Sequence, residues 1–232
     1  MAVLLVTGVA MTSCDKNDNP VVTPVSKTYF PSWNACEALT ALQAYVEDVT
    51  NPQSPHFISV EDRIATFDMD GTFVGELYPT YFEYNLLEYR VLDDEAYRDR
   101  APEDVREAAQ AIRDFVRHGK ALPEHFDMIK NLKTNKVLQI TQEIGKVPVL
   151  SFGNSSGDCA MHNYCLGNKT HRSAAFMLTA DDEGRDHANA AKALKLGEQW
   201  RAAGYYVISM KHDFKTIYGP GVEKTDFSFA AG

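Results

Sequence analysis

The apolar positions of this chain fall into two patterns, short continuous runs and longer stretches with helical spacing. Continuous runs over 147–152, 174–179 and 205–210 predict strands, and a shorter run over 63–67 predicts another that ends at two aspartates. Because strands and helices alternate, we expect an α/β fold with a Rossmann-like, doubly wound parallel sheet and ligand chemistry at the carboxyl ends of its strands. Helices are expected over 32–48, 81–91, 102–118, 136–145, 155–166 (after a loop) and 189–203.

The strand over 63–67 leads into two carboxylates, Asp68 and Asp70, followed by a Gly-Thr turn. Alternate residues of an extended strand share a side, so both carboxylates can converge on one small site. They repel each other unless a cation lies between them, and a divalent cation with oxygen ligands fits best. A calcium loop of the EF-hand type would need acidic residues where Thr72 and Pro79 stand. The pattern therefore favours a phosphoryl-transfer site.

This Asp-x-Asp-x-Thr motif resembles the first motif of the haloacid dehalogenase-like (HAD) superfamily. The resemblance implies that Asp68 is the nucleophile that becomes an aspartyl-phosphate and that Asp70 is the general acid and base. The second aspartate is typical of the phosphatase branch of that family. Thr72 closes the motif and is assigned to phosphate binding.

The segment 77–130 is helical in pattern throughout, with Pro102 opening one helix, Gly119 ending it and Pro123 opening a short third helix. An all-helical insertion directly after the first motif resembles the C1-type cap of the HAD family, here abbreviated. The α/β core is then expected to comprise residues 28–76 and 131–232.

A second candidate loop follows the strand over 147–152, with the sequence Gly-Asn-Ser-Ser-Gly-Asp over 153–158. It resembles the fourth HAD motif in a phosphoserine-phosphatase-like branch, which completes a magnesium shell. Two alignments are open: Asn154 is a direct ligand and Asp158 holds a ligand water, or Ser156 replaces a lost ligand and Asp158 binds the metal alone. We favour the first. The expected Mg²⁺ ligands are Asp68, Asp70, Asn154 and Asp158.

The third HAD motif is a lysine, and Lys136 matches it by position, with Lys133 as the rival. It would balance the charge of the nucleophile and the bound phosphate. The second motif, a strand that ends in Ser or Thr, has no counterpart before Lys136, where only Thr134 offers a hydroxyl. The chain resembles a family member with an internal deletion, which would leave the strand before Asp68 at the edge of the sheet.

Charge and the N-terminal pattern bear on partners and location. A net charge of −9 disfavours nucleic acid as a partner. The apolar stretch before Cys14 is too short to span a bilayer and resembles a bacterial lipoprotein signal, so we expect a lipid anchor on Cys14. Residues 1–27 would then be the signal and tether. The lipid would be the one contact with the membrane, and the protein would lie in the cell envelope. No pattern indicates an oligomeric state.

The remaining cysteines and the histidines carry weaker signals. No Cys-x-x-Cys or His-x-x-x-His spacing occurs, so a zinc site is not expected. We interpret His162 and His212 as surface or satisfied residues. A bridge between Cys159 and Cys165 stays open, but small buried apolar roles are favoured for Cys36, Cys159 and Cys165.

Two hypotheses follow. The first is a Mg²⁺-dependent phosphomonoester hydrolase that acts on a small phosphorylated metabolite through an aspartyl-phosphate; amino-acid phosphates, sugar phosphates and nucleotides all fit it. The second is a catalytically impaired, membrane-tethered binding protein or remnant that keeps the fold. The missing second motif and Ser156 favour the second hypothesis, whereas Asp68, Asp70 and Lys136 favour the first.

Overall fold

The computed structural model describes residues 29–75, 80–122 and 131–224. The chain divides into two units, Met1–Pro31 and Ser32–Gly232, and the fold described below belongs to the second. The expected signal and tether, residues 1–27, lie entirely outside the described residues. Within the described part of the chain, no helix combines the length and hydropathy that a membrane span requires.

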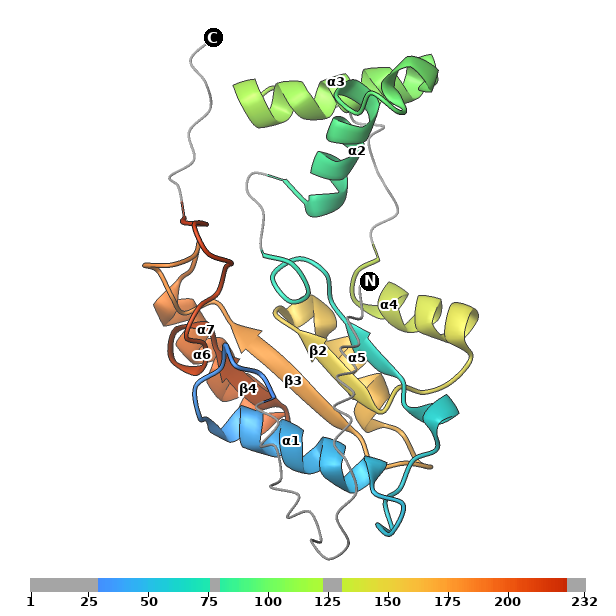
Figure 1. Cartoon of the computed structure of the whole chain (residues 1–232), viewed down its shortest axis with the longest axis vertical. Helices are drawn as coiled ribbons and strands as arrows, with labels where there is room; N and C mark the ends of the chain where they lie inside the picture. Colours follow the sequence, from blue (N-terminus) through green and yellow to red (C-terminus); the bar gives the residue numbers. More distant parts are fainter. Residues whose placement is uncertain (1–28, 76–79, 123–130, 225–232) are drawn as a thin grey trace, which may run out of the picture. The chain divides into compact units, whose positions relative to one another are not determined.

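A four-stranded, all-parallel sheet forms the centre of the second unit, in the order β1-β2-β3-β4 (Figure 1). Ala65 pairs with Leu150, Phe152 with Phe176, and Phe176 with Tyr206, so the strands are in direct register. This confirms the predicted α/β class with a parallel sheet. The strands are β1 (Ala65–Phe67), β2 (Leu150–Gly153), β3 (Ala174–Thr179) and β4 (Tyr206–Ser209).

Helices pack on both faces of the sheet because both faces are apolar. On one face, α1 (Glu37–Thr50) contributes Leu42 and Tyr45 to a core with Phe176 of β3. The Tyr45 hydroxyl donates to the carbonyl of Val149 at 2.7 Å, which joins this helix to the chain just before β2. On the other face, Met177 packs with side chains of α5 (Cys159–Leu166) and α6 (Ala190–Ala202). Coverage of both faces is what a doubly wound sheet requires.

β1 is an edge strand, as expected from the missing second motif: among the described residues only β2 pairs with it. A ladder of stacked rings crosses the sheet from this edge. The centroids of Phe67 and Phe152 are 4.7 Å apart, those of Phe152 and Phe176 5.1 Å, and those of Phe176 and Tyr206 5.0 Å. Such stacking adds to the burial of apolar area in register neighbours. The ladder ends at Phe67, which is 50% exposed.

The segment between β1 and α4 contains two paired helices, α2 (Phe82–Leu92) and α3 (Glu103–His118). They share a small core of their own around Val91 and Ala109, and Arg113 joins them through a 2.8 Å ion pair with Glu88. Gly119 ends α3 in the left-handed conformation with φ 67°, which favours glycine. The third helix expected from Pro123 falls outside the described residues.

Two helices differ from their predicted form. α1 begins at Glu37 rather than after Ser32, because the Cys36 sulfur accepts from the Leu39 amide at 3.4 Å and caps the helix. The helix expected over 136–145 is α4 (Thr134–Gln139), which continues as a π-helical turn, η3 (Ile140–Ile144). The shorter elements are the 3₁₀ turns η1 (Val60–Asp62), η2 (Arg98–Arg100) and η4 (Ser156–Asp158), and α7 (Met210–Asp213).

Arg185 holds the chain after β4 in place. Its guanidinium pairs with Asp182, which is almost fully buried. It also donates to four backbone carbonyls, those of Met210, Lys211, Phe214 and Lys215, at 2.9 to 3.1 Å. One charged side chain therefore bonds carbonyls of both α7 and the two residues that follow it.

Candidate active site

The first carboxylate, Asp68, comes directly after β1, where the strand becomes a tight turn. The Asp68 amide still donates to the carbonyl of Phe152 in β2 at 2.9 Å, so the sheet fixes its backbone. The turn is closed by the Gly71 amide, which donates to the carbonyl of Val74 at 2.9 Å, and Gly71 has φ 74°. Asp70 lies between these two fixed points. Hydrogen-bonded backbone thus positions both carboxylates.

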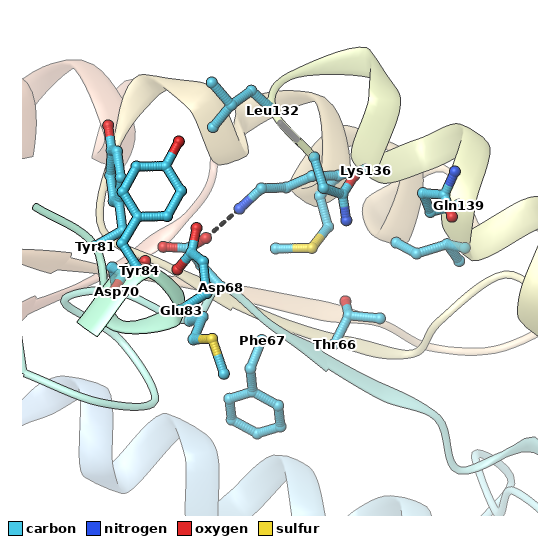
Figure 2. Close-up of a pocket in the computed structure, with 14 residues that line it drawn as sticks. Thr66, Phe67, Asp68, Asp70, Tyr81, Glu83, Tyr84, Leu132, Lys136 and Gln139 are labelled. Atoms are coloured by element: carbon cyan, nitrogen blue, oxygen red, sulfur yellow. Dashed lines mark hydrogen bonds and ion pairs between the residues drawn. The ribbon is translucent and has the colours of Figure 1, made fainter. Parts of the chain in front are cut away.

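Lys136 of α4 joins Asp68 to Asp158, the last residue of η4. Its ammonium donates to Asp68 Oδ1 and, at 2.5 Å, to Asp158 Oδ1 (Figure 2 shows the bond to Asp68). Lys136 is 7% exposed and Asp158 1%. A buried ion triad of this kind is stable only when each charge has close partners. The structure therefore brings together three of the residues predicted from the sequence.

The other oxygen of Asp158 is engaged by its own loop. Oδ2 accepts from the amides of Asn154 at 3.1 Å and Ser155 at 2.9 Å, and from the Ser155 hydroxyl at 3.1 Å. Ser155 and Asp158 form a capping box at the start of η4. A Cβ on Gly153 would lie 2.6 Å from the Asp158 Cβ, so only glycine lets this carboxylate fold back against the strand end. Asp158 is thus a buried partner of Lys136 rather than a group facing open space.

The charges of the triad shift the pKa values of two members. Burial alone would lower the pKa of Lys136, but its bonds to Asp158 and Asp68 outweigh that effect and raise the pKa above the ordinary value. Burial raises the pKa of Asp68, because one lysine shared with Asp158 compensates only part of the cost. The ammonium therefore stays protonated at neutral pH, and a further cation near Asp68 would favour the ionised carboxylate.

Asp68, Asp70 and Lys136 line one cavity of about 440 Å³, which we call the aspartate cavity (Figure 2). The Oδ1 atom of Asp70 accepts from the Phe82 amide at 3.2 Å, so the start of α2 contacts the second aspartate. Among the described residues that line this cavity, the carboxylates are those of Asp68, Asp70 and Glu83, and the ammonium is that of Lys136. The lining thus carries an excess of negative charge.

Three other residues predicted at the site lie against different cavities. Asn154 and Ser156 line a cavity of about 720 Å³ at the carboxyl ends of β2 and β3. Thr72 lines a third cavity of about 180 Å³, where its buried hydroxyl has no hydrogen-bond partner among the described residues. Lys133, the rival of Lys136, is exposed before α4. The structure does not bring Asn154 or Thr72 into the aspartate cavity.

The residues fit a hard cation in part. Asp68 and Asp70 line the same cavity, and carboxylate oxygens with retained waters are the usual ligands of Mg²⁺. Asp158 does not fit as a direct ligand, because both of its oxygens are bonded to protein groups and it is buried. No group of three or more Asp, Glu, His or Cys side chains suited to a metal occurs in the described part of the chain. Asp68 and Asp70 are therefore the two residues that would hold Mg²⁺, with water completing the shell.

Hydroxyls for a bound phosphate are scarce in the aspartate cavity. Thr66 is the one serine or threonine in its described lining, and its hydroxyl donates to the carbonyl of Leu150 at 3.4 Å. Thr134, the candidate suggested by the sequence, is exposed at the start of α4 and does not line the cavity. In the described lining of this cavity, the serine and threonine hydroxyls are therefore limited to that of Thr66.

His162 was interpreted from the sequence as a surface or satisfied residue, and the structure shows it buried with one ring nitrogen hydrogen-bonded. It is 0% exposed beneath the site, and its Nδ1 shares a 2.6 Å hydrogen bond with the Ser151 hydroxyl. Its Nε2 is buried with no hydrogen bond among the described residues. Burial lowers the His162 pKa to about 4, against the opposing influence of Asp158. Sequence gave no signal for this because a single histidine on α5 has no ligand spacing.

The three cysteines of the described chain are free, and Cys165 is buried, so no bridge forms between Cys159 and Cys165 in this structure.

Comparison of the sequence with protein-family models gives no match, and comparison with curated proteins gives none either. The site must therefore be interpreted from its own residues.

Proposed function

We propose that this chain is a Mg²⁺-dependent phosphomonoester hydrolase of the HAD superfamily, in which α2 and α3 belong to a small C1-type cap. One observation carries the proposal: an aspartate at the carboxyl end of a parallel strand is bonded to a buried lysine and shares a cavity with a second aspartate two residues later. Phosphoryl transfer needs a nucleophile, a proton carrier and local positive charge, and these residues supply all three.

In the proposed reaction, a carboxylate oxygen of Asp68 attacks phosphorus and forms an acyl phosphate. The ester bond breaks, and the leaving alkoxide takes a proton from Asp70. Asp70 then accepts a proton from the water that cleaves the acyl phosphate, which releases inorganic phosphate and restores Asp68. Lys136 balances the charge at Asp68 throughout. Bound Mg²⁺ would offset the excess negative charge of the cavity lining.

Hydrolysis of p-nitrophenyl phosphate by the purified full chain tests the proposal. We expect activity with Mg²⁺, loss of activity with a chelator, and loss in Asp68→Asn. Asp99→Asn is a matched control, because that side chain is 82% exposed and lies outside the aspartate cavity. A wild-type rate no higher than that of Asp68→Asn would refute the proposal. A covalent phosphoryl group trapped on Asp68 in Asp70→Asn, detected by peptide mass spectrometry, would support the stated intermediate.

The alternative is a catalytically impaired binding protein that keeps the fold. The observation that favours it is the edge position of β1, beside which the described residues place no further strand that ends in a serine or threonine. Under this alternative, calorimetry would detect Mg²⁺ binding that depends on Asp70, while no substrate is turned over. The two proposals thus differ in the assay already described.

A lipid anchor on Cys14 remains part of the proposal, although this residue lies outside the described chain. Its test is metabolic labelling with a radioactive fatty acid in a bacterial host. We expect label in the wild type and none in Cys14→Ser. Equal labelling of both proteins would contradict the anchor.

A further inference from the structure

The aspartate cavity has an unusually apolar wall for a site that would bind phosphate. Three large apolar side chains in its lining are far from buried: Met69 is 45% exposed, Tyr81 38% and Leu132 48%. The ring of Phe67 points away from Asp68 and Lys136 in Figure 2 and stacks on Phe152 instead. Exposed apolar side chains that converge on one cavity indicate a ligand that covers them. The carboxylates and Lys136 suffice to bind and transfer a phosphoryl group. That chemistry involves none of these apolar side chains.

Tyr81 is positioned to meet a planar group. Its ring lies nearly perpendicular to that of Tyr84, with a centroid distance of 5.9 Å and an interplanar angle of 85°. Tyr84 is 5% exposed and therefore supports Tyr81 from within the protein. Both rings lie beside Asp68 and Asp70 in Figure 2. A supported aromatic ring next to the reacting carboxylate suits stacking or edge-to-face contact with the leaving group of a substrate.

The polar lining complements this wall. The side-chain amides of Asn131 and Gln139 line the cavity, and both are exposed. Amides donate and accept hydrogen bonds, as the edge of a heteroaromatic ring does. A polyol or simple sugar would instead leave the exposed apolar side chains uncovered. The volume of about 440 Å³ lies within the ordinary range for small-molecule sites.

From these contacts we infer that the substrate is a phosphomonoester whose alcohol carries a planar heteroaromatic ring, such as a nucleoside monophosphate. This inference rests on the proposed phosphatase function. The phosphoryl group lies at Asp68, and the ring contacts Tyr81. Tyr81 is a specificity residue in this arrangement and takes no part in the bond changes at phosphorus.

AMP and ribose 5-phosphate form the sharpest substrate pair, because both are phosphate esters of the primary C5 hydroxyl of ribose and differ at C1, where AMP carries the base and ribose 5-phosphate a hydroxyl. We expect kcat/KM for AMP to exceed that for ribose 5-phosphate by about tenfold or more, since one stacked base is worth that much in other proteins. Tyr81→Leu should reduce this ratio about tenfold. Tyr89→Leu is the matched control, because Tyr89 is an exposed tyrosine of α2, the helix that directly follows Tyr81, and does not line the cavity. A ratio near one, or a ratio that Tyr81→Leu leaves unchanged, overturns the inference.

A binding experiment separates this inference from the proposed function. If the chain hydrolyses p-nitrophenyl phosphate but neither AMP nor ribose 5-phosphate, this inference fails and the proposed function stands. If it hydrolyses none of the three above the Asp68→Asn rate, the phosphatase proposal fails, and calorimetry with Mg²⁺ then measures AMP and ribose 5-phosphate on the wild-type chain. Saturable AMP binding at least about tenfold tighter than that of ribose 5-phosphate, and weakened by Tyr81→Leu, supports the ring site. Equal affinities, or no AMP binding, overturn it.

Discussion

Buried His162 makes a quantitative prediction about acid stability. Its pKa is about 4 in the folded protein, against an ordinary value of 6.5 that the unfolded chain should show. Between these values the unfolded chain binds more protons than the folded one, so stability rises with pH. The contribution is fully present above pH 6.5 and is lost as pH falls toward 4. Because one pKa unit corresponds to ~1.4 kcal/mol, the loss is about 3 kcal/mol.

Urea unfolding followed by far-UV circular dichroism at a series of pH values measures this loss. The wild type should lose about 3 kcal/mol more unfolding free energy across the interval than His162→Gln, which has no titrating ring. The glutamine variant starts from lower stability, because it loses the contact with Tyr205 at 5.1 Å, so only the difference in pH slope is compared. His118→Gln is the control, because His118 is exposed at the end of α3 and should keep the wild-type slope.

The result that would refute this reasoning is an equal pH slope in the wild type and His162→Gln. It would mean that burial does not lower the pKa of His162 in the folded protein. Comparison with the variant cancels the titration of the many carboxylates, which otherwise dominates acid unfolding.

Three further predictions concern groups around the site. Lys136→Met removes the only cation between Asp68 and Asp158 and should lower the free energy of unfolding by about 3–5 kcal/mol, measured in urea; a loss below ~1 kcal/mol would contradict a buried triad. Gly153→Ala forces a Cβ to within 2.6 Å of the Asp158 side chain and should cost about 1–3 kcal/mol, with loss of activity; unchanged thermal unfolding would show that the loop can yield. Arg185→Met removes four hydrogen bonds to backbone carbonyls and should expose residues 210–215 to limited proteolysis, whereas an unchanged digestion pattern would argue against this role.

Local sequence signals predicted most elements of the fold. The apolar run over 174–179 is the strand β3 with the same bounds, and Pro102 and Gly119 flank α3 as expected. The π-helical turn over Ile140–Ile144 has no local signal, since its residues also suit an α-helix. The cap at Cys36 was missed because cysteine is a rare capping residue and Ser32 is a common one.

The sequence predicts a residue of the candidate site only where that residue matches a motif or bonds to its neighbours in the chain. Lys136 was assigned by position, and the structure places it on Asp68. Asp158 was assigned to the metal, yet its spacing from Ser155 fits a capping box, a signal that pointed instead to the loop amides. The Lys136–Asp158 bond and the burial of His162 depend on how α4 and α5 pack, which no local pattern encodes.

The edge strand also has a consequence for the order of folding. Leu150 pairs with Ala174, and Phe176 with Tyr206, across single helical crossovers, whereas Ala65 must find Leu150 across the whole α2–α4 segment. Closing that longer loop costs more chain entropy, and only three residues of β1 compensate for it. We therefore expect β2, β3 and β4 to assemble first and β1 to join last. Asp68 would then reach Lys136 only in the final step of folding, so partly folded chains would lack the site altogether.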